Sequence, residues 1–317
     1  MARDAVTGAF GFTGRAIAEQ LLAAGQDVVT LSRRPAHPDD PLAARIQVKP
    51  LDFSRPADLT AALQGVDTLY NTYWMRFPRG TATFETAVAD STILLAAARE
   101  AGVRRVVHVS VVGADPAGAT PYVRAKGVLE AAVRASGLEW AIVRPTLTYG
   151  PNDILINNLA WALRRLPAYG IPGRGRYPIQ PVHVDDVARI CLEAGQGPGG
   201  QGPGGQVLDA AGPDTLEYRH LVGLVRTALG SRSVVLPMPT SAVLAAAKVL
   251  GLLVGDVVLT RHELMELSSG LLTSKEPARG RIRLEDWLGE HASELGRHWA
   301  SELKRNYSGP SGHQNLV

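Results

Sequence analysis

Cysteine is almost absent from this sequence. Cys191 is the only cysteine among 317 residues, so neither an intrachain disulfide nor a cysteine metal cluster is possible. The first residues also lack the charged region, apolar core and small-residue cleavage site of a secretory signal peptide. Both absences are typical of a protein in a reducing compartment, and we expect a cytoplasmic location.

A large excess of one charge is missing as well. The chain has 33 Lys and Arg against 30 Asp and Glu, a net charge of +3, and its arginines are scattered along the whole length. Proteins that bind nucleic acids concentrate Lys and Arg on one face or in one segment. We therefore expect no nucleic-acid partner.

No long uncharged apolar run is present. One largely apolar segment, residues 241–259, contains Lys248 and Asp256 and is interrupted by Gly251 and Gly255. A membrane-spanning helix needs about 20 nearly uncharged apolar residues. We therefore expect no membrane span, and the segment favours a buried or amphipathic helix in a cap over an apolar pocket.

The first half of the chain alternates short apolar, β-branched runs with helical patterns. Strands are predicted at residues 4–10, 27–34, 66–73, 103–114 and 138–150, with a further strand ending at "LDFS", and helices at residues 14–25, 57–65, 85–102 and 122–137. Apolar strands separated by helices predict a parallel sheet with right-handed crossovers, buried on both faces. The fold class is therefore α/β, a Rossmann-type doubly wound parallel sheet.

The rhythm changes after residue 150. The patterns predict a helix at 157–173, a strand and helix within 176–195, a helix at 217–230, further helices beyond it and a disordered tail at 306–317. The repeated "GPGGQ" at 197–206 predicts a flexible surface loop. We assign residues 1–150, completed by about 178–210, to a dinucleotide-binding domain, and 151–177 with 211–317 to a smaller, mostly helical substrate-side lobe.

The segment "VTGAFGFTGRA" carries Gly8, Gly11 and Gly14 between a predicted strand and a helix that begins near Phe12. In this context Gly8 makes the turn, Gly11 lets the backbone approach a pyrophosphate, and Gly14 packs the helix against the strand. Phosphates would bind the free amides around Phe12 and Thr13, at the positive end of the helix dipole. The alternative is a strand–helix turn without a ligand.

The end of the second strand narrows the choice of cofactor. NAD-binding sites place Asp or Glu there to bind the ribose 2′-hydroxyl, whereas this chain has Ser32, Arg33 and Arg34. Guanidinium groups bind a 2′-phosphate through charge-assisted hydrogen bonds. NADP(H) is therefore favoured, NAD(H) stays possible, and the alternative is that both arginines are only solvated. Asp52 and Phe53 lie where an adenine would be held.

Tyr122 and Lys126 form a Y-x-x-x-K pair on a predicted helix. Residues four apart share one helix face, so the ammonium lies close to the phenol and lowers its pKa from the ordinary value near 10. Such a tyrosine can exchange a proton with a substrate oxygen. By itself the pair also occurs on ordinary helix surfaces; its place after the strand "VVHVS" favours the catalytic interpretation.

The chain resembles the extended or atypical branch of the short-chain dehydrogenase/reductase superfamily, whose members are epimerase- or dehydratase-like. The motifs that carry the resemblance are "TGAFGFTG", "LDFS", "HVSVVGAD", "YVRAK", "RPTLTYGPND" and "QPVHVDDVA", in the family's order. The stretches "NTYWMRFPRG" and "RLEDWLGEHASELGRHWASEL" are similar to bacterial relatives of the nucleotide-binding accessory subunit of respiratory complex I. The resemblance implies the fold and a nicotinamide dinucleotide cofactor.

The resemblance also implies roles for single residues. Tyr122 would be the acid/base, Lys126 would hold the ribose and tune the tyrosine, and Pro145 would border the nicotinamide. The chain departs from the family where consecutive serines follow the strand before the tyrosine, because Ser110 is followed by two valines. Either Ser110 contacts the substrate or that contact is missing.

A second departure follows the fourth strand, where the family commonly has small residues. This chain has "YNTYW", and the resemblance implies that Asn71, Thr72, Tyr73 and Trp74 place bulk beside the nicotinamide. Asp185 and Asp186, near His183, are interpreted as an N-cap of the following helix, and we expect no metal site.

Two functions remain open. The first is an NADP(H)-dependent oxidoreductase or epimerase-like enzyme with a small, apolar carbonyl or alcohol substrate. The second is a non-catalytic NADP(H)-binding redox sensor or accessory subunit. The sequence leaves the oligomeric state open between monomer and homodimer.

The arginines make a testable prediction. NADPH should bind more tightly than NADH, and replacing Arg33 and Arg34 by Ala should remove most of that preference, because a hydrogen bond to a charged group contributes about 1.5–3 kcal/mol. Titration of both nucleotides into both proteins measures it. Equal affinities in the unaltered protein would contradict the assignment.

Overall fold

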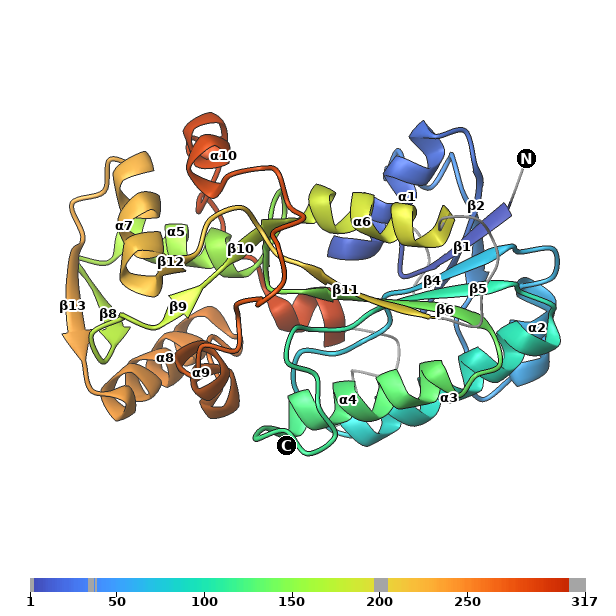
Figure 1. Cartoon of the computed structure of the whole chain (residues 1–317). Coiled ribbons are helices and arrows are strands. Elements are labelled where there is room, and N and C mark those ends of the chain that lie inside the picture. The colour runs from blue at the N-terminus through green and yellow to red at the C-terminus, as the bar shows by residue number, and fades with distance from the viewer. Residues whose placement is uncertain (1–2, 34–36, 38, 197–204, 308–317) are drawn as a thin grey trace. The chain divides into compact units, whose positions relative to one another are not determined.

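We describe the chain from a computed structural model that covers residues 3–33, 37, 39–196 and 205–307 (Figure 1). The chain divides into two compact units. Unit 1 contains Met1–Pro145 and Val184–Ala210, and unit 2 contains Thr146–His183 and Ala211–Val317.

Unit 1 is built on a seven-stranded sheet in the order β11-β6-β5-β4-β1-β2-β3. Every neighbouring pair is parallel. The strands are β1 (Arg3–Thr7), β2 (Asp27–Ser32), β3 (Gln47–Pro50), β4 (Thr68–Asn71), β5 (Arg105–Val109), β6 (Glu139–Pro145) and β11 (Gln206–Ala210). The doubly wound α/β prediction is confirmed.

Helices cover both faces of this sheet. They are α1 (Phe12–Ala23), α2 (Pro56–Ala62), α3 (Phe84–Glu100), α4 (Pro121–Arg134) and α6 (Val184–Gln196). In Figure 1, α1 and α6 lie on one face, and α3 and α4 lie on the other. Because strand residues such as Ala5, Leu31 and Leu69 are fully buried, the strands show continuous apolar runs in the sequence.

The strand order changes direction between β1 and β4, which are neighbours in the sheet but not in the sequence. In doubly wound sheets, ligands bind at such a switch point, outside the carboxyl ends of the strands. The fold therefore points to the carboxyl ends of β1 and β4 as the place to search for a site.

Unit 2 contains three two-stranded sheets and most of the remaining helices. Strands β7 (Leu147–Tyr149) and β10 (Pro181–His183) pair in parallel, as do β8 (Ala168–Pro172) and β13 (Val234–Met238), while β9 (Pro178–Ile179) and β12 (Leu216–Glu217) are antiparallel. The helices are α5 (Leu155–Arg165), α7 (Tyr218–Ala228), α8 (Thr240–Val254), α9 (Arg261–Ser268), α10 (Leu284–His291) and a π-helical turn, Leu303–Tyr307.

Two predicted elements of this region are wrong. The strand predicted at 138–150 is two strands, β6 and β7, which belong to different units and are separated at Thr146, whose hydroxyl donates to the Gln180 carbonyl at 2.5 Å. The helix predicted at 157–173 ends at Arg165. Pro167 lacks the N–H that a continuing helix needs, and β8 follows instead.

The aspartates near His183 are also placed differently from the prediction. Helix α6 begins at Val184, so Asp185 and Asp186 lie in its first turn and neither is the N-cap. A carboxylate in a first turn is favourable because it faces the positive end of the helix dipole. Asp186 also accepts a hydrogen bond from Arg189 at 3.0 Å.

The apolar segment at 241–259 forms α8, which ends at Gly255 with a left-handed φ of +64°. Of the two predicted alternatives, a buried helix is wrong, because Gly251 is the one buried residue of α8. A cap over an apolar pocket stays a prediction. No helix in the described ranges is long and apolar enough to cross a membrane. Residues 197–204 of the "GPGGQ" repeat and 308–317 of the tail lie outside the described residues.

Asp4 generates a prediction about stability. It is 6% exposed in β1, and burial, followed by the nearby Asp67, raises its pKa to about 6 from 3.8. The native state therefore binds this proton more tightly than the unfolded state does, and the resulting stability is lost as the pH rises from about 4 to 6. Asp4→Asn should raise the free energy of unfolding at pH 7 by roughly 1–3 kcal/mol.

At pH 4 the same variant should match the parent, because Asp4 is then largely protonated in the native state. Urea unfolding at both pH values measures the difference. Asp39→Asn is the control, since the Asp39 side chain is 91% exposed. An Asp4→Asn variant that is less stable than the parent at pH 7 contradicts the assignment.

Candidate nucleotide-binding and catalytic site

The parallel strands of unit 1 bring the predicted site residues to one edge of the sheet. They follow or end successive strands: Gly8 after β1, Ser32 and Arg33 at the end of β2, Asp52 and Phe53 after β3, Thr72 after β4, Ser110 after β5, and Pro145 at the end of β6. Arg34 lies outside the described residues. The carboxyl edge therefore collects these members of the predicted set, while Tyr122 and Lys126 lie on α4.

The glycine turn is tight. Gly8 has a φ of +67°, its N–H donates to the Leu31 carbonyl at 2.8 Å, and the Gly11 N–H donates to the Gly8 carbonyl at 2.8 Å. A Cβ at Gly14 would lie 2.3 Å from the Gly8 oxygen, and a Cβ at Gly11 would lie 3.1 Å from it. Gly14 is thus required by packing, whereas Gly11 has the extended backbone of an N-cap and would accept a Cβ after a shift of a few tenths of an ångström at the Gly8 carbonyl.

Helix α1 presents its N-terminus at this turn. Gly11 is the N-cap and supplies no side-chain hydrogen bond to the first turn, which holds Phe12 and Thr13. First-turn amides have no partner within a helix, and the helix dipole makes this end positive. An uncapped N-terminus beside a glycine turn fits the pyrophosphate of a dinucleotide.

Aromatic rings surround the end of β2. The Arg33 guanidinium is exposed and lies 5.4 Å from the centroid of the Tyr73 ring. Phe53 packs on the same tyrosine, with centroids 4.8 Å apart. The Asp52 carboxylate already accepts hydrogen bonds within its own turn, from the Ser54 N–H at 3.0 Å and from the Ser54 hydroxyl at 2.6 Å. Arg33 and Phe53 are therefore held at one place by Tyr73.

A buried polar network ties β1 to β4 at the switch point. The Thr72 N–H donates to the Thr7 hydroxyl at 2.7 Å, and the Thr72 hydroxyl donates to the Thr7 carbonyl at 2.5 Å. The Asn71 side-chain oxygen lies 3.2 Å from the Thr7 hydroxyl, and the Asn71 amide nitrogen lies 3.4 Å from His108 Nδ1. This network fixes the chain as it leaves β4.

Tyr122 and Lys126 lie on the first turns of α4. Thr120 caps this helix by accepting from the Val123 N–H at 3.3 Å. The Tyr122 ring meets Trp74 and Phe84 edge-on, at centroid distances of 5.9 and 5.7 Å.

Lys126 is held by two groups. Its Nζ donates to the Val109 carbonyl at 3.1 Å and lies 4.2 Å from the centroid of the Trp74 ring. Trp74 therefore contacts both the phenol of Tyr122 and the ammonium of Lys126.

Burial changes the charge of the lysine. Lys126 is 2% exposed, and burial lowers its pKa to about 7, against the opposing effect of the Glu130 carboxylate. The pKa of the fully buried His108 is also lowered, first by burial and then by the Lys126 charge. Near neutral pH the Lys126 side chain is therefore present both as the ammonium and as the neutral amine. An exposed lysine, with a pKa near 10.4, is present almost entirely as the ammonium.

Glu130, which no sequence motif singled out, is 1% exposed. Its carboxylate accepts from Arg144 at 2.6 and 2.8 Å, from Arg134 at 3.0 Å and from the Ser110 hydroxyl at 2.7 Å. The Ser110 proton is thus directed to an interior ion pair. The available signal was spacing, because Glu130 lies four residues after Lys126 on the same helix face.

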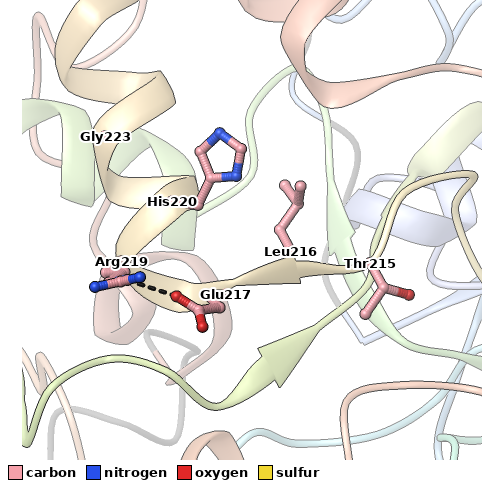
Figure 2. A pocket seen from close by; sticks show the side chains of 6 residues that line it. All are labelled: Thr215, Leu216, Glu217, Arg219, His220 and Gly223. Carbon is pink, nitrogen blue, oxygen red and sulfur yellow. Dashed lines mark hydrogen bonds and ion pairs between the residues drawn. The ribbon is translucent and has the colours of Figure 1, made fainter.

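A separate pocket of about 610 Å³ lies in unit 2. Figure 2 shows the residues that line it: Thr215, Leu216, Glu217, Arg219, His220 and Gly223. Glu217 and Arg219 form an ion pair, and Arg219 and His220 both lie on α7. The pocket contains none of the predicted cofactor-binding or catalytic residues. The glycine turn and the helix that carries Tyr122 and Lys126 both lie in unit 1.

Comparison with known proteins identifies the class of domain. A family model described as NAD(P)H-binding matches residues 8–156. The chain is 30% identical over 230 residues to the (4-alkanoyl-5-oxo-2,5-dihydrofuran-3-yl)methyl phosphate reductase of Streptomyces griseus, a match that covers 71% of this chain and 73% of that protein. The chain therefore carries an NAD(P)H-binding domain.

Two further proteins are similar. The mitochondrial NADH dehydrogenase (ubiquinone) 1 alpha subcomplex subunit 9 of Arabidopsis thaliana is 27% identical over 256 residues, covering 77% of this chain but less than two thirds, 62%, of the plant protein. The NADPH-dependent quinone oxidoreductase of Escherichia coli, solved with NADPH, has a TM-score of 0.70 and 21% identity, covering 91% of this chain and 98% of the other. The second likeness concerns the fold.

The glycine turn generates a prediction with a built-in comparison. Gly11→Val places a branched side chain where the pyrophosphate should approach, so NADPH affinity should collapse while the circular dichroism spectrum stays nearly unchanged. Gly14→Ala should instead destabilise the fold by roughly 1–3 kcal/mol, because it overpacks the helix–strand contact.

Gly289→Val is the matched control, since a Cβ at Gly289 meets no atom within 4 Å. Isothermal titration and thermal unfolding separate the two effects. Parent-like NADPH binding by the Gly11→Val variant means that the phosphates bind elsewhere.

Proposed function

We propose that this chain, which belongs to the extended branch of the short-chain dehydrogenase/reductase superfamily, is an NADP(H)-dependent oxidoreductase or epimerase-like enzyme. Its substrate would be a small, apolar carbonyl compound or alcohol. The observation that carries the proposal is the Tyr122–Lys126 pair on α4, at the sheet edge where the glycine turn and the uncapped N-terminus of α1 lie. The nicotinamide, when bound, supplies or accepts a hydride at the substrate carbon.

The chain's own residues would supply the proton. In the reductive direction the Tyr122 hydroxyl donates its proton to the substrate oxygen as the carbonyl becomes an alcohol, and in the oxidative direction the phenolate takes that proton back. The positive charge of Lys126 stabilises the phenolate. Because the pKa of Lys126 is about 7, this charge is present below neutral pH and is lost above it.

Aromatic walls support an apolar substrate. Trp74 and Phe84 stack nearly parallel, with centroids 5.9 Å apart and an interplanar angle of 6°, and both contact the Tyr122 ring. Next to such rings a polar substrate would lose its hydration without gaining hydrogen bonds, which is costly. The rings of Trp74 and Phe84 therefore favour a substrate whose only polar group near Tyr122 is the reacting oxygen.

Arg33 supports NADP(H) as the preferred cofactor, with NAD(H) still possible. It ends β2 as an exposed cation on the Tyr73 ring, and no carboxylate follows Leu31 in "LSRR". A guanidinium held against an aromatic ring keeps its hydrogen-bond donors in its own plane, available for a phosphate.

A non-catalytic NADP(H)-binding sensor or accessory subunit is the second candidate. It is favoured by the similarity to the Arabidopsis subunit and by the Ser110 hydroxyl, which donates to Glu130. Both functions require nucleotide binding. Only the enzyme requires the Tyr122 proton.

Removing that proton tests the enzyme directly. Ketones, enones and quinones with apolar substituents would first be screened for NADPH oxidation. On a confirmed substrate, Tyr122→Phe should keep NADPH affinity near that of the parent and lower kcat by about 10²–10⁴-fold, the usual contribution of acid–base catalysis. Tyr307→Phe is the control, and a Tyr122→Phe variant as active as the parent refutes the acid/base role.

Ser110→Ala separates two roles for the serine. If Ser110 contacts the substrate, kcat falls and the free energy of unfolding is unchanged. If Ser110 serves only Glu130, the variant loses stability and keeps its kcat, because a buried carboxylate loses one donor.

A further inference from the structure

Exposed apolar side chains are concentrated in one part of unit 2. In the described part of the chain nine large apolar residues are exposed, and six of them lie between residues 234 and 265. These six are Val234, Leu236, Val249, Leu252, Leu253 and Met265. Single exposed apolar residues are ordinary on a protein surface, whereas a cluster indicates an interaction site.

Helix α8 carries the most exposed members. Ala245, Val249, Leu252 and Leu253 follow each other at helical spacing and form one stripe, the α8 stripe. Val249 is 59% exposed, Leu252 78% and Leu253 79%. Lys248 is exposed at the margin of the stripe. The stripe is therefore a continuous apolar ridge with a cation at its side.

The opposite side of α8 is apolar as well. Val243, Leu244, Leu250 and Val254 are half-buried and Gly251 is buried. Apolar residues on two opposite sides of a helix are typical of a protein core or of a lipid phase. Since one side of α8 already packs on its own unit, the α8 stripe requires a second apolar environment.

The charge on α8 favours an anionic environment. Residues 240–260 contain two charged residues, Lys248 and Asp256. Asp256 is buried and accepts from the Trp299 indole and from the Glu302 and Leu303 amides, so the exposed charge of this segment is the Lys248 ammonium. A long lysine side chain beside an apolar ridge can extend its ammonium to the headgroups while its methylenes stay in the apolar layer.

We propose that the α8 stripe docks on the surface of a lipid bilayer that contains anionic headgroups. A second copy of the chain is disfavoured as the occupant, because a specific dimer uses about 20–30 residues on each side, and the stripe has four. The proposal does not depend on the enzymatic function, and vesicle binding is measured without nucleotide or substrate.

Flotation with vesicles tests the docking. The full chain should float with vesicles of phosphatidylcholine and phosphatidylglycerol, and more weakly with phosphatidylcholine alone. Replacing Leu252 and Leu253 together by Ser should lower binding at least about ten-fold, because each leucine loses most of its transfer free energy. Lys248→Glu should lower binding to the anionic vesicles at least about five-fold. The control is Leu155→Ser with Val207→Ser, at two exposed sites on other elements.

A fluorescent label gives a second, local readout. Cys191, the only cysteine, is fully buried, so Val249→Cys provides one reactive thiol on the stripe for an environment-sensitive dye. Anionic vesicles should shift its emission to the blue, while a dye at Val207→Cys should not respond. No vesicle binding by the parent, parent-like binding of the double Ser variant, or a dimer that dissociates in that variant would each overturn the proposal.

Discussion

The candidate site depends on one buried carboxylate, that of Glu130. It lies inside unit 1 and joins three elements: its own helix α4, β5 through the following Ser110, and β6 through Arg144. An unpaired charge at this depth is strongly destabilising, so the two guanidinium partners and the serine hydroxyl must stay in place. Helix α4 is thereby fixed against the sheet, and the side chains of Tyr122 and Lys126 are fixed with it.

Helix α4 carries Tyr122 and Lys126 at the carboxyl edge of the sheet, where ligands bind in doubly wound folds. The sheet reverses its order between β1 and β4, and the glycine turn and the Thr7–Thr72 network shape the chain on each side of that point. Trp74 follows β4 in the chain, and its ring contacts the Tyr122 ring and the Lys126 ammonium. Its indole Nε1 has no hydrogen-bond partner in the described part of the structure. Binding of a ribose by Lys126 would require this ring to move off the ammonium.

The sequence predicted features that follow from local rules. Parallel strands and intervening helices follow from apolar runs, the turn from the spacing of Gly8, Gly11 and Gly14, and the place of Tyr122 and Lys126 on one helix from helical periodicity. These rules also placed the described cofactor-binding candidates at one sheet edge. The NAD(P)H-binding fold is confirmed by comparison, while the individual site residues remain predictions.

Features that depend on tertiary contacts were not predictable. Nothing local marks Thr146 as the residue where one apolar run passes from one unit to the other, and β8 forms because β13, more than sixty residues later, pairs with it. Glu130 and Trp74 gain their importance from partners on other elements. The exposure of Leu252 and Leu253 contradicts the general tendency of apolar residues to be buried.

The most direct test of the account is a crystal structure of the protein with bound NADPH. The account predicts the pyrophosphate on the amides at the start of α1, the adenosine phosphate beside Arg33, and the Tyr122 hydroxyl facing open space next to the nicotinamide, with Trp74 displaced from Lys126. A nucleotide bound elsewhere, or a nicotinamide kept away from Tyr122 by a Trp74 that still covers Lys126, would contradict it.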